Sequence, residues 1–186
     1  MKQFTFNDTD RMKDIVTAIK PENIGKEKKE KIVDMLEELG ELIELHPRNG
    51  LNFCMGGGMQ VIVDVMIDNP DAEIRRTACV SFSQLTQNNM EVQQFALRSG
   101  ALRLMQQFVK EEPLKAKEAV IGALSAFLRG DNFNSKREFI EKYGGLKFLS
   151  AIIMDDQNEQ TTYRLIKKVL FLAYDFCLND DSIFGE

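Results

Sequence analysis

Three consecutive glycines, at positions 56 to 58 in FCMGGGMQVIVDV, are the first residues whose spacing could serve ligand chemistry. A glycine cluster ahead of an apolar run can cradle a phosphate, or it can form a turn between two helices. A P-loop requires GxxxxGK[ST], and a dinucleotide site requires GxGxxG after a strand. Neither motif follows here, and the segment before the glycines has an apolar helical pattern. The triplet therefore predicts a turn rather than a nucleotide site.

The three cysteines, Cys54, Cys79 and Cys177, are far apart, lie among apolar neighbours and form no CxxC pair. This pattern suggests neither a zinc site nor a disulfide framework. Buried free thiols in a reducing compartment are the simplest interpretation.

The remaining candidates for catalysis are one histidine and the acidic side chains. His46 precedes Pro47 at an expected helix end, where capping is its expected role. The carboxylates Glu37, Glu38 and Glu41 fall on the polar face of a helix, and solvated carboxylates are poor acid–base catalysts. We therefore expect no enzyme, no cofactor and no metal site.

Composition narrows the class further. The chain has 186 residues, 44% of them hydrophobic, and a net charge of −5 from 24 basic and 29 acidic side chains. An acidic balance argues against nucleic-acid binding. The first residues lack the apolar core of a signal peptide, and no apolar stretch approaches eighteen residues. We expect a cytoplasmic protein that neither spans nor binds a membrane.

Residues 1–47 predict two helices. The first stops before Pro21, because the residue preceding a proline avoids helical geometry. The second carries apolar residues at three- and four-residue spacings, which form one stripe of an amphipathic helix. The members of this stripe are Ile32, Met35, Leu36, Leu39, Leu42 and Ile43.

From there the sequence is self-similar. Gly57, Gly100 and Gly144 recur at intervals of 43 and 44 residues, and each precedes an apolar run and then a longer helical segment. In this register Met66 corresponds to Val109 and Ile153. Among the expected core positions, Ala78 corresponds to Val120, Phe82 to Leu124, and Leu85 to both Phe127 and Phe176. A helical period of roughly 40–47 residues is typical of armadillo and HEAT arrays.

We therefore predict an all-α fold, an armadillo-repeat right-handed α-solenoid of about three three-helix repeats preceded by two N-terminal helices. The glycines form the turns between the first and second helices, because glycine accepts positive φ. The expected divisions are an N-terminal helical cap at 1–47, repeats at 48–89, 90–131 and 132–179, and a C-terminal tail at 180–186.

The segment EIRRTACVSFSQLTQNNMEVQ, residues 73–93, resembles the armadillo-type nucleotide exchange factors of the heat shock protein 70 chaperone. The matching residues are Glu73, Arg75, Ala78, Cys79, Gln87, Asn88, Asn89 and Gln93. The likeness continues through GALRLM and ALSAFLRG and covers about residues 10–178. Two departures are Arg48-Asn49-Gly50 before the first repeat and Ala119 where the family has a lysine. The chain also has about three repeats, whereas the family has a fourth and a cap.

The resemblance implies a co-chaperone without catalytic residues. It would grip one lobe of the chaperone's ATPase domain with the concave face of its long helices, displace the other lobe and release ADP. The alternative is a generic armadillo scaffold that binds an extended peptide; the absence of Trp from this chain weakens it, because peptide-binding grooves of that type use repeated Trp. A monomer is expected in either case.

The resemblance and the helical spacing together give a set of expected partner-binding residues. They are Arg75, Arg76, Gln84, Gln87, Asn88, Lys117, Ser125, Arg129, Arg164, Lys168 and Tyr174. Structural roles compete with this interpretation at several positions. Gln87, Asn88 and Asn89 could simply close a helix, and Tyr174 could be half-buried in the core.

Overall fold

The computed structural model describes residues 6–46, 48–110, 114–130, 133–154 and 163–178. These residues fold into helices, and none of them forms a β-strand, so the all-α prediction is confirmed. The helices are α1 (Phe6–Ile19), α2 (Pro21–Ile24), α3 (Lys29–Leu45), α4 (Arg48–Met55), α5 (Gly58–Asp68), α6 (Ala72–Thr86), α7 (Met90–Arg98), the 3-10 helix η1 (Ala101–Arg103), α8 (Leu104–Lys110), α9 (Leu114–Leu128), α10 (Phe133–Arg137), the π-helix η2 (Glu138–Lys142), α11 (Gly145–Met154) and α12 (Tyr163–Leu178).

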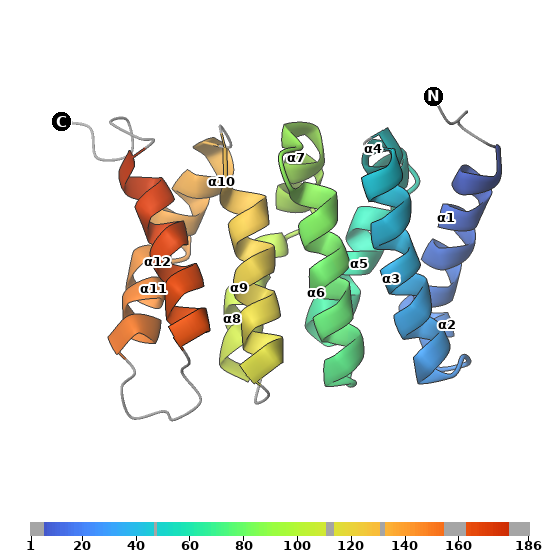
Figure 1. Ribbon diagram of the computed structural model, residues 1–186, viewed down its shortest axis with the longest axis horizontal. Helices are drawn as coiled ribbons and strands as arrows, with labels where there is room; N and C mark the ends of the chain where they lie inside the picture. The colour runs from blue at the N-terminus through green and yellow to red at the C-terminus, as the bar shows by residue number, and fades with distance from the viewer. Residues whose placement is uncertain (1–5, 47, 111–113, 131–132, 155–162, 179–186) are drawn as a thin grey trace.

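The helices are arranged in layers (Figure 1). The long helices α3, α6, α9 and α12 stand side by side in that order, and each packs against the next. The shorter helices α5, α8 and α11 lie behind this front layer, and α1 closes the N-terminal edge against α3. The arrangement is consistent with an α-solenoid.

Two N-terminal helices were expected, and the structure contains a third, short one between them. The helix α1 ends before Pro21, as predicted, but Pro21 itself starts α2. Proline is favoured in a first helical turn because its missing N–H has no partner there anyway. The predicted stripe of α3 is buried except for Leu42, which is half-buried.

A glycine turn directly precedes each of α5, η1 and α11. Gly57, Gly100 and Gly144 have φ angles of 82°, 77° and 66°, and the next residue starts α5, η1 and α11 in turn. Positive φ is cheap for glycine alone, so the prediction of turns is confirmed. Gly58 has a different reason, because a Cβ there would lie 2.5 Å from the ring of Phe53.

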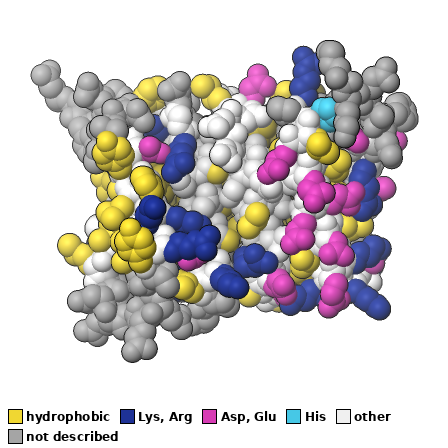
Figure 2. All heavy atoms as spheres, viewed as in Figure 1, with side chains coloured by type: hydrophobic (Ala, Val, Ile, Leu, Met, Phe, Trp, Pro, Cys, Tyr) yellow, Lys and Arg dark blue, Asp and Glu magenta, His cyan; other side chains and the backbone are white. Residues whose placement is uncertain are grey.

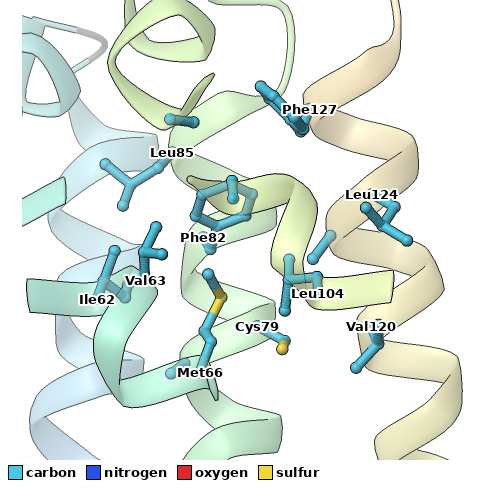
Figure 3. Packing of buried hydrophobic residues seen from close by; sticks show 14 of the residues in the cluster. Ile62, Val63, Met66, Cys79, Phe82, Leu85, Leu104, Val120, Leu124 and Phe127 are labelled. Atoms are coloured by element: carbon cyan, nitrogen blue, oxygen red, sulfur yellow. The ribbon is translucent and has the colours of Figure 1, made fainter. Parts of the chain in front are cut away.

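The hydrophobic core runs between the layers. Phe82 packs among Ile62 and Met66 of α5 and Leu104 of α8 (Figure 3), and its ring meets Phe127 edge to face at 6.2 Å. The expected core positions Ala78, Phe82, Leu85, Val120, Leu124, Phe127 and Phe176 are all buried. The long helices therefore share one continuous core.

The predicted correspondence of Val109 with Met66 is wrong. Met66 is fully buried, whereas Val109 is 73% exposed. The 3-10 turn η1 precedes α8 and has 3.0 rather than 3.6 residues per turn, so it rotates the helix that follows. Phe108 takes the inward position instead and meets the ring of Phe148 edge to face at 5.3 Å.

The outer flank of α12 is apolar and open. Leu170 is 50% exposed, although in the register of the core positions it corresponds to Ile121, which is fully buried. A shallow hollow of about 570 Å³ runs along this flank between the side chains of Tyr163, Leu170, Phe171 and Tyr174. The outer flank of α12 is therefore apolar in the way expected of a side that packs against another long helix.

Candidate partner-binding face

The front layer presents one row of outward-facing, mostly polar residues along each of its central helices. Residues spaced by four, three and four positions lie on one face of a helix. On α6 this row is Arg76, Val80, Ser83 and Gln87, and on α9 it is Glu118, Gly122, Ser125 and Arg129. Together with the facing sides of α3 and α12, these rows form the front face.

Charged contacts join α9 to α12 across this face. The Lys168 ammonium donates to the backbone carbonyl of Glu118 at 3.1 Å, and the Arg164 Nε lies 3.6 Å from the Glu118 carboxylate. Burial lowers the pKa of Lys168, the Arg164 cation lowers it further, and the Glu118 carboxylate opposes both. At the upper end, Arg129 Nε pairs with Asp175 Oδ2 at 2.9 Å.

Charge is sorted along the front face (Figure 2). Acidic side chains gather over α3, which carries six acidic and two basic residues. Basic side chains gather over α9 and α12, which together carry five basic and two acidic residues. The two ends of the face therefore attract opposite charges.

The Gln-Asn-Asn segment at residues 87–89 has structural roles where α6 ends and α7 begins. Gln87 is the C-cap of α6, and Asn88 is the residue with positive φ, at 54°. Asn89 caps α7, because its side-chain oxygen accepts from the N–H of Val92 at 3.2 Å. Asn tolerates both geometries. Gln87 and Asn88 are exposed, so partner contact at these two residues stays a prediction.

Gln93 acts inside the protein. Its side chain is 3% exposed, and its Nε2 lies 3.0, 3.1 and 3.2 Å from the carbonyl oxygens of Thr86, Ala126 and Arg129. One amide therefore joins α7 to the C-terminal ends of α6 and α9. Sequence reasoning identified Gln93 as part of the resemblance but missed this role.

Three of the expected residues face neighbouring elements. The Gln84 amide donates to the carboxylate of Glu44 on α3 at 2.8 Å. The Arg75 guanidinium donates to the carbonyl of Asn69, at the end of α5, at 2.6 Å. Lys117 points back toward α8, with its ammonium 5.6 Å from the centroid of the Phe108 ring, because it is one residue, or 100° of helix, from the front row.

The other expected partner-binding residues differ in how exposed their side chains are. Ser125 is in the front row but only 9% exposed, so its side chain is largely covered. Arg76 is half-buried in a hollow that Lys29, Glu73 and Lys115 also line. Tyr174 is 57% exposed on the outer flank of α12, so the half-core interpretation does not hold.

The structure thus places Arg164 and Lys168 beside Glu118 at one end of the α9 row and Arg129 at its other end, with Gln87 at the end of the neighbouring row. Ser83 and Gly122 also belong to the face, and sequence reasoning missed them. The signal that could have found them is the offset of 42 residues between the core positions of α6 and α9, which also relates Ser83 to Ser125.

The described residues give little support for a reactive cysteine, a metal site or a membrane-spanning helix. Burial raises the pKa of the Cys54 thiol to about 12, and Cys54 and Cys79 are buried and form no disulfide; the side chain of Cys177 lies outside the described residues. Among these residues, no group of three His, Cys, Asp or Glu could hold a metal ion. No single described helix is long and apolar enough to span a membrane, although α4 and α5 pass that test jointly across a bend of 83°.

A layered all-helical fold with a broad, charged polar face is typical of proteins that bind other proteins. The comparison with family models narrows this class. The SIL1/FES1/HPBP1 C-terminal domain model matches residues 49–183, so the chain belongs to this family of Hsp70 nucleotide exchange factors. A comparison with curated proteins gave no match.

Proposed function

We propose that this chain is an armadillo-type co-chaperone that binds the ATPase domain of a heat shock protein 70 chaperone through its front face. By displacing one lobe of that domain, it promotes ADP release. The observation that carries the proposal is the family match over residues 49–183, which include almost all of α4 and every described helix from α5 to α12. These helices supply the α6, α9 and α12 parts of the front face.

The mechanism requires differential affinity and no chemistry. A protein that binds the open ATPase domain more tightly than the closed one shifts the population toward the open state. The rigid, continuously packed layer of long helices suits this role, because a stiff surface resists deformation when the partner's lobes close. Arg76, Gln87, Arg129, Arg164 and Lys168 are the expected partner-binding residues that the front face presents.

The helix order supports the proposed repeats. The groups α4–α6, α7–α9 and α10–α12 fall within 48–89, 90–131 and 132–179, and each contains one of the glycine turns at Gly57, Gly100 and Gly144. The cap at 1–47 holds α1 to α3. The tail at 180–186 lies outside the described residues. We propose a monomer that acts in the cytoplasm, where thiols outside any disulfide, such as those of Cys54 and Cys79, stay reduced.

Release of a fluorescent ADP analogue from the isolated ATPase domain tests the proposal. The wild-type chain should accelerate release, and the double variant Gln87→Ala, Arg129→Ala should accelerate it less. Lys147→Ala is the matched control, because Lys147 is exposed on α11, behind the front layer. An unchanged release rate at saturating wild-type protein would contradict the proposal, and tight binding of an extended peptide instead would favour the generic scaffold.

A further inference from the structure

Gly122 lies inside α9, on the front face, and no described residue packs so closely that a glycine is required there. A Cβ at this position would lie 3.8 Å from Lys168 Nζ and 4.0 Å from Ser83 Oγ, which are ordinary contacts. At Gly58, by contrast, the ring of Phe53 leaves no room for a side chain. Glycine is the poorest helix former after proline. The helix therefore carries an unfavourable residue that internal packing does not explain.

The space over Gly122 is bordered by cations. Lys168 lies on one side, and its ammonium has three N–H donors, of which it gives one to the Glu118 carbonyl. Arg164 lies one helical turn away on α12, with a side chain that is 77% exposed. The Glu118 side chain, which is 13% exposed, is held beneath them. A helix position without a side chain, next to Lys168 and one helical turn of α12 from Arg164, suits an incoming anionic group.

We propose that the space over Gly122 receives an acidic side chain of the partner protein, whose carboxylate pairs with Lys168 and Arg164. This inference rests on the proposed function and specifies the partner surface as one that carries exposed carboxylates. The absent side chain at Gly122 lets the partner approach the helix backbone closely. A charge-assisted pair with a partly desolvated cation is stronger than an exposed one.

The charge pattern of the front face then sets the orientation of the complex. An acidic partner patch is attracted to α9 and α12 and repelled by the acidic side chains over α3 (Figure 2). Complementary charge steers association and excludes the reversed arrangement. The partner's acidic patch thus docks at the C-terminal half of the face.

Gly122→Leu tests the proposal directly, because it fills the space with a good helix former. We expect an unchanged or higher melting temperature and about a tenfold weaker affinity for the chaperone's ATPase domain, with a smaller loss for Gly122→Ala. Ala151→Leu is the matched control, since Ala151 is an exposed small residue on α11. Its affinity should equal that of the wild type.

A second arm tests the charge. Arg164→Glu should weaken binding about tenfold at low ionic strength and much less at high salt, and Arg164→Lys should largely restore it. Lys147→Glu makes the same charge change on α11 and should have little effect. If the wild type binds and accelerates ADP release while Gly122→Leu and Arg164→Glu behave like it, this inference alone is overturned. If the wild type does not bind the ATPase domain, the proposed function fails with it.

Discussion

The side-chain nitrogen of Gln93 lies 3.2 Å from the backbone carbonyl oxygen of Arg129, a residue 36 positions further along the chain. The same nitrogen contacts the carbonyls of Thr86 and Ala126. The last carbonyls of a helix have no partner within the helix. One buried amide therefore satisfies the ends of two front-layer helices and fixes their relative position.

Gln93→Ala should destabilise the fold by about 1–3 kcal/mol, because it leaves buried carbonyls without a donor. Gln93→Glu should destabilise it more at neutral pH, since a carboxylate would face three carbonyl oxygens, and acid should relieve part of that loss by restoring a donor. Urea unfolding followed by circular dichroism measures both. The control is Gln94→Ala, because Gln94 is exposed. Equal losses at the two glutamines would contradict the assignment.

Gly57→Ala should cost about 1–2 kcal/mol, because alanine is strained at a φ of 82°. Crowding is not the cause, since a Cβ at Gly57 would have no neighbour within 4 Å. Gly25 is a fair comparison, because it is equally open but has a φ of −79°. Gly25→Ala should therefore be neutral or slightly stabilising. A similar effect of both substitutions on the melting temperature would refute the role of backbone conformation.

Sequence periodicity was sufficient for the helices, the glycine turns and the core, because 3.6-residue spacing and positive φ are local properties. It failed where the burial or the direction of a side chain depends on neighbouring elements. The turn η1 rotated Val109 to the surface, and Gln93 turned inward toward carbonyls distant in sequence. Lys117 was expected on the front face because its spacing was judged without the position of α8. The open space at Gly122 also depends on Lys168, 46 residues later.

Ile121 and Leu170 occupy corresponding positions of successive long helices but differ in exposure, at 0% and 50%. Ile121→Ala should therefore destabilise the fold by about 2–5 kcal/mol, through lost burial and the cavity left behind. Leu170→Ala should cost less than about 1 kcal/mol. Chemical denaturation of the two variants makes the comparison. A large loss for Leu170→Ala would mean that the outer flank of α12 is covered in solution.

The ion pair between Arg11 and Glu38 ties α1 to α3 and should make stability depend on pH. The Arg11 Nε donates to Glu38 at 2.7 Å, and this hydrogen bond holds the pKa of Glu38 below its usual value of 4.5. A lowered folded-state pKa stabilises the fold above the unfolded pKa, and the contribution is lost as pH falls through the folded value.

Glu38→Gln should therefore be less stable than the wild type by at most about 1 kcal/mol near neutral pH, because the pair is partly exposed. The difference should shrink as pH drops below about 4.5. Melting temperatures across this range measure it, with Glu37→Gln as the exposed control. A difference that grows in acid would contradict the sign.

Variants of the ion pair between Arg129 and Asp175 distinguish a contact of Arg129 with the partner from a purely structural role of the pair. Arg129 is about half exposed while bound to Asp175 at 2.9 Å. If Arg129 contacts the chaperone, Arg129→Ala should reduce the acceleration of ADP release about tenfold, since arginine is a frequent hot-spot residue. Asp175→Asn should preserve or increase that acceleration, because it frees the guanidinium for the partner. If the pair only ties α9 to α12, both variants should lose activity and melting temperature together. Arg129→Lys keeps the charge but not the planar fork, so an intermediate release rate for it would favour direct pairing with a partner carboxylate.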